Sequence, residues 1–368
     1  MATNNVINNA FLSDYTGLNK VSRNLIIGGD FGVNPWQRGT TFTGLATASY
    51  SADRFRSDFV STQVSNISRS TNVPTVAATN YYTNNSFLMT VTTADAAIAA
   101  GDYYNITQRV EGYNFAEVAQ RPFTLSFWVK AVKTGIYCVS FVNGGSDRSY
   151  VAEYTINTTA TWEKKTVKVT ASPSAGTWDY TTGIGLSVSW ALACGSTFQT
   201  SANAWQTGNY FGTSNQVNAL DSNTNTFQLA LIQLEAGSVA TPFEQKTIKN
   251  VLSACQRYYF KTFAQGTDPI QNLGSNVNAA GYRIPIAGIT AQSQQVTFPV
   301  TMRVAPTMTY YNTNNTNTNW YNQSLGADSG ASSTVSVGQN NIIIGNAQVV
   351  GDLVSNRVYI HATGDSEL

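Results

Sequence analysis

Few residues in this sequence of 368 could carry out catalysis. The only histidine is His361, and it lies on the polar phase of the last expected strand, so we expect it to be exposed. One histidine, with no serine or cysteine signature near it, makes neither a catalytic triad nor a histidine-rich metal site. Gly28 and Gly29 follow an apolar run but precede no helical pattern, and no Gly-x-Ser-x-Gly turn or phosphate-binding loop occurs. We therefore expect no catalytic residue, no cofactor and no metal-binding residue.

Glycoside hydrolysis stays open as an alternative, because that reaction needs only two carboxylates at a set separation. A sequence does not show such a separation. The Asp and Glu residues of this chain are scattered over expected strand ends and turns, where a structural role is usual. A polysaccharide-degrading enzyme is therefore our second alternative, behind functions without catalysis.

Aromatic residues offer a better-founded chemistry, which is the recognition of sugars. Sugars present apolar C–H faces that stack on aromatic rings, and hydroxyl groups that pair with Asn, Gln and Asp. Trp36 and Trp190 lie among apolar residues, so we expect them in the core. Aromatic side chains in polar loops are costly to expose unless they contact something. On this ground the candidates for contacting a glycan are Trp178, Tyr180, Trp205, Tyr210 and Trp320.

Contact between subunits is an equally good interpretation for two of these candidates, Trp178 and Trp205. The same alternative applies to Trp128, which alternates out of phase with Phe127 on an expected strand. Trp128 should therefore lie on an outer sheet face or against a neighbouring subunit.

Composition excludes two classes of partner. Charged residues make up 11% of the chain and the formal net charge is +1, with no run of either sign. Nucleic acid binding would need a basic patch, so we expect no nucleic acid partner. No stretch approaches the roughly 20 apolar residues that cross a bilayer, so we expect no membrane insertion. The first residues also lack the basic and apolar regions of a signal peptide.

The three cysteines, Cys138, Cys194 and Cys255, are far apart in the sequence. We expect them to be buried free thiols, since a free cysteine behaves as a small apolar residue. A bridge between Cys138 and Cys194 stays possible if both lie on neighbouring strands.

Alternating patterns predict an all-β fold. The clearest is Phe123-Thr-Leu-Ser-Phe-Trp-Val-Lys-Ala131, in which every second residue is apolar. Similar short segments recur from Phe59 to about Glu235, separated by Gly, Asn and Ser. This spacing is typical of an antiparallel β-sandwich. We assign residues 23–240 to this domain, and alternation beyond residue 258, as in Val296 to Val304, predicts a second, smaller β domain over residues 258–368.

One helix is expected between the two domains, over residues 241–257. Thr241-Pro242-Phe243-Glu244 has the form of a capping box with proline at the first helical position. Ile248, Val251, Leu252 and Cys255 then follow at helical spacing. The helix could begin later than this cap indicates.

Residues 1–22 are polar, rich in Asn and without any period. They are either a disordered terminus or an arm that docks on another protein. The arm interpretation rests on a group of apolar residues in this polar segment, namely Phe11, Leu12, Tyr15 and Leu18.

The stretch Asn24-Leu-Ile-Ile-Gly-Gly-Asp-Phe-Gly-Val-Asn-Pro-Trp-Gln-Arg-Gly39, followed by Tyr50-Ser-Ala-Asp-Arg-Phe55, resembles the opening of a known family. The family is the carbohydrate-binding-module type of β-jelly roll that recurs in tail fibres and other virion fibre proteins of tailed bacteriophages. Asp30 and Phe31 stand in the order opposite to the common one. Phe123–Ala131 and Phe227-Gln-Leu-Ala-Leu-Ile-Gln-Leu-Glu-Ala-Gly237 extend the resemblance, which covers roughly residues 24–310.

This resemblance implies a structural fibre protein of a virion, made in the host cytoplasm, which attaches as a tail fibre to glycan at the host surface. A capsid decoration or head fibre protein is the alternative. It also implies a homotrimer, no catalysis, and an N-terminal arm that anchors the chain to other virion proteins. Related jelly rolls often hold a structural Ca²⁺, and Asp30 and Glu235 are the matching places here, which leaves a bound Ca²⁺ open.

Overall fold

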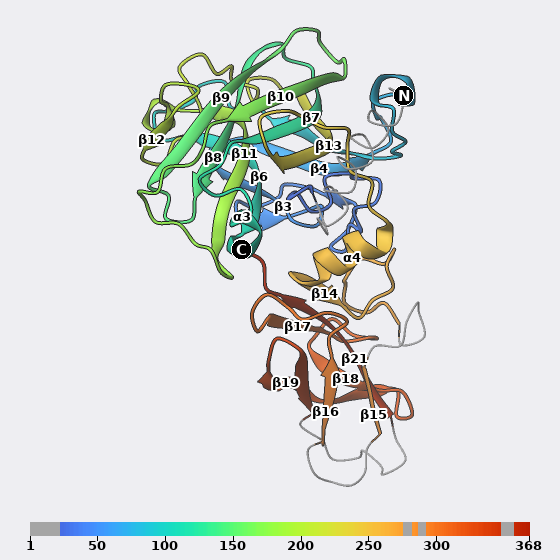
Figure 1. Ribbon diagram of the computed structural model, residues 1–368. Coiled ribbons are helices and arrows are strands. Elements are labelled where there is room, and N and C mark those ends of the chain that lie inside the picture. Colours follow the sequence, from blue (N-terminus) through green and yellow to red (C-terminus); the bar gives the residue numbers. More distant parts are fainter. Residues whose placement is uncertain (1–22, 275–281, 286–291, 347–356) are drawn as a thin grey trace, which may run out of the picture.

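The computed structural model of the chain describes residues 23–274, 282–285, 292–346 and 357–368. In these ranges most regular elements are β-strands, and all paired strands are antiparallel. Figure 1 shows a large β-sandwich and a smaller distal unit joined end to end, with helix α4 at the junction. The predicted all-β fold of sandwich, helix and second β unit is confirmed.

The sandwich consists of two facing sheets of jelly-roll type. The six-stranded sheet has the order β1-β4-β5-β13-β7-β10, in which the strands are β1 (Thr41–Phe42), β4 (Val64–Ser70), β5 (Ser86–Thr93), β7 (Phe123–Ala131), β10 (Glu163–Val169) and β13 (Thr226–Ala236). The seven-stranded sheet has the order β12-β9-β8-β11-β6-β3-β2, in which they are β2 (Ser49–Tyr50), β3 (Phe55–Val60), β6 (Tyr103–Glu111), β8 (Gly135–Asn143), β9 (Arg148–Ile156), β11 (Ile184–Cys194) and β12 (Trp205–Thr207).

The inner faces of the two sheets form the main core. Strand β7 has the predicted bounds, and Phe123 and Phe127 on its inner face are fully buried. Across the sandwich, Phe123 packs against Phe141 with 5.3 Å between ring centroids, and Phe127 packs against Trp190 at 5.7 Å. The prediction that Trp190 belongs to the core is confirmed, and so is that for Trp36, which is 2% exposed.

The opening stretch packs along β13 without forming a strand of its own, although an apolar run such as Leu25–Ile27 is typical of a buried strand. The Asn24 side chain makes the hydrogen bonds to β13 that the backbone of a neighbouring strand would make. Its Nδ2 donates to the carbonyl of Ile232 at 2.9 Å, and its Oδ1 accepts from the Leu234 amide at 3.0 Å. The chain then turns at Gly28, where φ is +69° and a Cβ would lie 2.4 Å from the Asn34 side chain. Only glycine combines that backbone angle with so close an approach.

Short helical elements connect the strands: α2 (Val76–Thr79), α3 (Gly112–Phe115), η1 (Ser196–Phe198) and α4 (Ile248–Gln256). Helix α4 begins at Ile248, capped by the Thr247 side chain, so the predicted start at residue 241 is wrong. The expected capping residues have other partners. Thr241 donates to the Glu235 carboxylate at 2.6 Å, while the Glu244 carboxylate accepts from the backbone amides of Arg23 and Asn24.

The distal unit is built around its last strand, β21. Its strands are β14 (Tyr259–Lys261), β15 (Tyr282–Pro285), β16 (Gln292–Thr297), β17 (Thr307–Tyr311), β18 (Asn319–Asn322), β19 (Ala327–Val337), β20 (Asn341–Asn346) and β21 (Arg357–Asp365). Strand β21 pairs with β14, β15, β17 and β18. The alternation read as one strand up to Val304 ends at Thr297, because Phe298 and Met302 turn into the core and their amides donate to the carbonyls of Asn340 and Gln339.

His361 on β21 is buried, with 1% of its surface exposed, so the prediction of an exposed histidine is wrong. The segment after β14 covers this face of the sheet. The His361 ring stacks on Phe263 with 4.2 Å between centroids, and its Nδ1 lies 2.9 Å from the Thr262 hydroxyl. Strand alternation could not show this cover, which comes from about 100 residues earlier in the chain.

We expect the stability of the chain to fall in mild acid because of this histidine. Burial lowers the pKa of His361 from 6.5 to about 4, so between these values the unfolded state binds a proton that the folded state does not. From pH 7.5 to pH 4.5 the loss should be about 2–3 kcal/mol. Urea unfolding at both pH values should show a smaller loss for His361→Gln than for the wild type. An equal loss in both proteins would contradict this assignment.

Two arginines, the half-buried Arg257 and the buried Arg54, connect the sandwich to the distal unit. The Glu111 carboxylate at the end of β6 accepts hydrogen bonds from Arg257 at 2.5 and 2.9 Å and from the Tyr258 hydroxyl at 2.5 Å. Arg54 lies over the Tyr258 ring, 3.5 Å from its centroid, and pairs with Glu367. The last residues of the chain thus return to the sandwich, as the position of the C-terminus in Figure 1 shows.

Candidate functional site

A cluster of aromatic rings lies at one end of the sandwich. Phe115 at the end of α3 contacts Trp178 and Tyr180 from the segment that connects β10 to β11. Trp178 in turn meets Trp205 on the edge strand β12, with 5.6 Å between ring centroids. The structure therefore brings three of the predicted site residues, Trp178, Tyr180 and Trp205, into one cluster.

Two of these rings lie nearly parallel to a third. Trp178 stacks on Phe115 at 5.1 Å and Tyr180 stacks on the same ring at 6.1 Å, each with an interplanar angle of 11°. Because both are nearly parallel to Phe115, they are also close to parallel with each other. Phe115 itself is fully buried, whereas Tyr180 is 40% exposed. We call Trp178 and Tyr180, supported by Phe115, the aromatic platform.

The segment that carries the platform is held by short side chains. The Asp147 carboxylate accepts from the amide of Thr177 at 3.0 Å and from its hydroxyl at 2.9 Å, and the Asn143 amide donates to the carbonyl of Thr177 at 2.9 Å. Hydrogen bonds from Asn143 and Thr177 lower the pKa of Asp147, so it is ionised at neutral pH. Asp179, between the two platform residues, accepts from the amides of Thr181 and Gly183.

Close backbone approach also fixes the support of the platform. A Cβ on Gly185, at the start of β11, would lie 2.4 Å from the Cβ of Phe115. Any larger residue at this position would push Phe115 away from the sheet. The platform is therefore tied to a rigid strand as well as to a loop, which is the kind of support that an ordered binding surface needs.

The polar atoms of the two indoles already have partners. Trp178 Nε1 donates to the carbonyl of Ala175, and Trp205 Nε1 donates to the carbonyl of Thr170, each at 3.1 Å. What the platform offers to a ligand is consequently ring surface, together with the Tyr180 hydroxyl. Tyr113 on α3 is 57% exposed and lies beside the segment that carries the platform, since its amide donates to the carbonyl of Thr181. Such a surface can stack on a flat apolar face of a ligand.

Tyr210 lies elsewhere, on the outer face of the seven-stranded sheet. It packs on a small cluster made by Cys138, Val151 and Ala191. Trp320 lies in the core of the distal unit, 0% exposed, with its Nε1 donating to the carbonyl of Gly345 at 3.0 Å. The prediction that Trp320 contacts a glycan is therefore wrong, since its ring has no free face. The Asn- and Thr-rich tract before it hides this burial in the sequence.

Sequence reasoning missed two residues of the site, Phe115 and Tyr113. Both occur in the short stretch Gly112-Tyr-Asn-Phe115, which carries no strand pattern. Their only signal was two aromatic residues in a turn.

Trp128 lies, as predicted, outside the main core, and packs partly buried on a cluster of Tyr81, Ala230 and Leu231 on the outer face of the six-stranded sheet. The four arm residues Phe11, Leu12, Tyr15 and Leu18 fall outside the described residues.

The two places considered for Ca²⁺ are occupied by protein donors. Asp30 accepts from the hydroxyls of Tyr81 at 2.7 Å and Thr83 at 2.6 Å. Glu235 accepts from Gln233 and Thr241. Over the part of the chain that the structure describes, no three His, Cys, Asp or Glu residues gather in a way that could hold a metal ion.

The cysteines are free and buried, as predicted, and Cys138 and Cys194 are not bridged. Burial raises the pKa of Cys138 to about 11 and that of Cys194 to about 12, so both thiols stay protonated at neutral pH. None of the helices in the described ranges has the length and apolar character needed to cross a membrane.

Comparison with known proteins gives likeness of fold at low similarity. No family model and no curated protein matches the sequence. Among solved structures, the enzymatically active domain of tailspike protein 4 from bacteriophage CBA120 matches 58% of this chain at 12% identity and a TM-score of 0.31, over 21% of its own length. The chain thus spans about a fifth of that tailspike domain.

Two carbohydrate-binding modules from Clostridium thermocellum match in the same way. The family 11 module, in complex with a β-1,3-1,4-mixed-linked tetrasaccharide, matches 55% of this chain and 99% of its own at 11% identity and a TM-score of 0.29. The C-terminal family 22 module of Xyn10B matches 55% and 98% at 13% identity and a TM-score of 0.28. At these values the likenesses carry no argument about what this chain binds.

Proposed function

We propose that this chain is a structural fibre protein of a bacteriophage virion, and that it attaches to glycan at the host surface through the aromatic platform. The observation that carries the binding function is the near-parallel stacking of Trp178 and Tyr180 on the buried ring of Phe115. The virion assignment rests on the resemblance of residues 24–55 and of the later strands to phage fibre proteins. A binding function without catalysis is supported by the sequence, which has a single histidine, and this histidine is buried.

A glycan suits the platform better than a protein or a charged ligand. A pyranose ring has a flat apolar face of C–H groups and a rim of hydroxyls. The platform offers ring faces at the centre, while Asp179 and Thr181 supply polar groups beside Tyr180. With its indole N–H already bonded, Trp178 contributes stacking and no hydrogen bond. Stacking of this kind is worth on the order of 1 kcal/mol per ring, so one site alone binds weakly.

Useful attachment then requires several sites on one particle. A homotrimer would present three platforms, and linked sites raise the overall affinity by factors on the order of 10²–10⁴ when the geometry lets them bind together. Light scattering of the purified chain should therefore give the mass of a trimer. A stable monomer at micromolar concentration would contradict this part of the proposal.

The location on the particle is tested by imaging virions labelled with an antibody to this chain. We expect label at the tail. Label over the capsid would show that the chain is a decoration or head fibre protein, which is the alternative, and not a tail fibre protein. Particles without label would overturn the virion assignment.

The attachment function is tested with purified chain and host cells. The chain should bind the cells, compete with phage adsorption, and release no reducing ends from host polysaccharide during long incubation. Release that disappears on replacing a nearby Asp/Glu pair would instead establish a polysaccharide-degrading enzyme. Absence of binding to cells and to isolated surface polysaccharide would overturn glycan attachment.

A further inference from the structure

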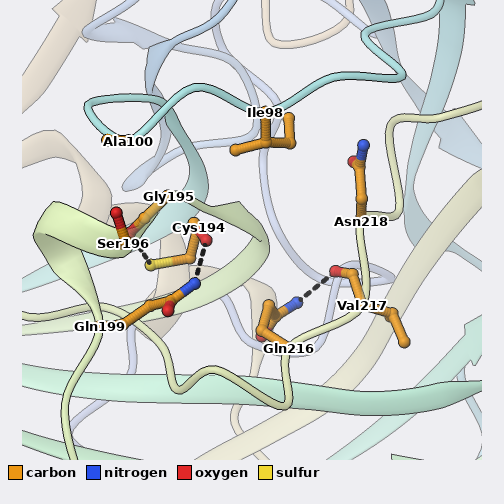
Figure 2. Close-up of a pocket in the computed structure, with 9 residues that line it drawn as sticks. All are labelled: Ile98, Ala100, Cys194, Gly195, Ser196, Gln199, Gln216, Val217 and Asn218. Atoms are coloured by element: carbon orange, nitrogen blue, oxygen red, sulfur yellow. Dashed lines mark hydrogen bonds between the residues drawn. The ribbon is translucent and has the colours of Figure 1, made fainter.

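The sandwich contains a cavity of about 330 Å³ that the proposed platform does not use. Figure 2 shows three segments around it. The turn after β5 contributes Ile98 and Ala100. The end of β11 contributes Cys194 and the residue after η1 is Gln199, while the segment before β13 contributes Gln216 and Asn218. This volume lies at the lower end of the range that is usual for small-molecule sites.

The cavity is separate from the platform. Strand β11 runs from Ile184 to Cys194 and connects the two places, since Gly185 supports Phe115 and Cys194 lines the cavity. At about 3.3 Å per residue the two ends of this strand lie about 30 Å apart. A ligand the size of one sugar ring therefore cannot occupy both.

All residues that line the cavity are uncharged. Its apolar wall comes from Ile98, and its polar groups are the amides of Gln199, Gln216 and Asn218 with the Ser196 hydroxyl. The Cys194 thiol adds no charge, because burial keeps it protonated at neutral pH. Burying a charged group here without a partner would be costly, so the lining selects a neutral ligand.

Internal hydrogen bonds hold the polar groups in place. Gln216 Nε2 donates to the carbonyls of Ala191 and Val217, each at 3.1 Å, and Gln199 Nε2 donates to the carbonyl of Cys194 at 2.7 Å. Asn218 donates to the carbonyl of Asp95 and accepts from the Leu220 amide. Both glutamines thus use their N–H groups within the chain, which leaves their side-chain carbonyl oxygens as acceptors for hydroxyl donors, and Gln216 Oε1 is buried without a partner.

We propose that this cavity is a second binding site, which takes a single neutral sugar residue. The combination of one apolar wall, fixed amides and no charge matches a neutral pyranose, with hydroxyl groups that donate hydrogen bonds and C–H groups that need apolar contact. The choice of a sugar rests on the proposed function, whereas the selection of a small neutral ligand rests on the cavity alone. One end of the sandwich then binds the face of a polysaccharide chain, and the other end binds a terminal or branching sugar residue.

The experiment is a titration of the full chain with free glucose, galactose, mannose and N-acetylglucosamine, followed by NMR, with glucuronate as the charged probe. We expect at least one neutral sugar to bind with a dissociation constant on the order of millimolar, and glucuronate not to bind. The proposal would be overturned if all four neutral sugars bound at least 100-fold more weakly than this dissociation constant. It would also be overturned if glucuronate bound more tightly than the neutral sugars.

Two variants from one turn locate the binding. Ala100→Trp fills the cavity from an exposed position and should weaken sugar binding at least tenfold, while Ala99→Trp, also exposed but outside the lining, should leave it unchanged. Gln199→Leu is a second test that keeps the volume and removes the acceptor. Equal binding by Ala100→Trp and wild type would overturn the cavity as the site.

The platform variant Trp178→Ala separates this inference from the proposed function. It should keep the binding of free sugar while losing that of host polysaccharide. If free sugar is lost in Trp178→Ala and kept in Ala100→Trp, the sugar binds at the platform and the cavity proposal fails alone. If polysaccharide binding persists in Trp178→Ala, the platform proposal fails while the cavity stays supported.

Discussion

Replacing Arg54 by methionine is expected to lower the free energy of unfolding by about 3–5 kcal/mol, because it leaves a buried carboxylate without its main cation. Arg54 is 1% exposed, pairs with Glu367, and donates to the carbonyl of Arg109 at 2.6 Å. Its guanidinium also covers the Tyr258 ring. After the change, the one cation that still pairs with Glu367 among the described residues is the more distant Arg38, 3.3 Å away.

Urea unfolding of Arg54→Met beside Arg69→Met measures this effect. Arg69 is an exposed arginine on β4, so its replacement should cost less than about 0.5 kcal/mol. The double change Arg54→Met/Glu367→Met should recover part of the loss, since it removes both buried charges. A loss below 1 kcal/mol in Arg54→Met would show that the junction of the two units does not depend on this pair.

The second large effect is expected at the platform. The double variant Trp178→Ala/Tyr180→Ala should weaken binding of host surface polysaccharide by about 30- to 150-fold, which corresponds to about 2–3 kcal/mol for two lost stacking contacts. Phe115 would lose its cover, so the variant must be compared by melting temperature as well. Trp178→Phe and Tyr180→Phe each keep a ring and should lose much less.

Tyr82→Ala is the matched control for exposed aromatic surface. Tyr82 is 73% exposed and follows Tyr81, which packs on the cluster outside the main core. Its removal should leave polysaccharide binding unchanged. Equal loss of binding in Tyr82→Ala and in the platform variant would mean that non-specific adsorption to exposed aromatic side chains, rather than the platform, accounts for the binding.

The sequence predicted those parts of the fold that depend on local alternation. Phe123–Ala131 has the predicted bounds because its period of two directly reports a sheet with one face in the core. The capping box at Thr241 was misread for a complementary reason. Thr241 donates to Glu235, six residues earlier, and Glu244 accepts from the backbone of Arg23 and Asn24, more than 200 residues earlier. Partners as distant as those of Glu244 leave no trace in a local pattern.

The same limit applies to the candidate site. Trp178 and Tyr180 could be singled out, because aromatic residues in a polar loop are unusual. Their support, Phe115, lies 63 residues from Trp178 in the sequence and only the fold brings it beneath them. The sequence wrongly predicts exposure for Trp320 and His361. Trp320 follows a polar tract and His361 lies on the polar phase of a strand, but other segments of the fold cover both side chains. Burial is decided by non-local packing, which alternation alone does not report.

The most direct test of glycan binding at the platform is an NMR titration that follows the indole N–H signals of the seven tryptophans while host surface polysaccharide is added. The indole signals of Trp178 and Trp205 should shift with increasing polysaccharide, while those of the buried Trp190 and Trp320 should stay in place. Shifts confined to other tryptophans, or no shift at saturating polysaccharide, would contradict the assignment of the platform as the binding site.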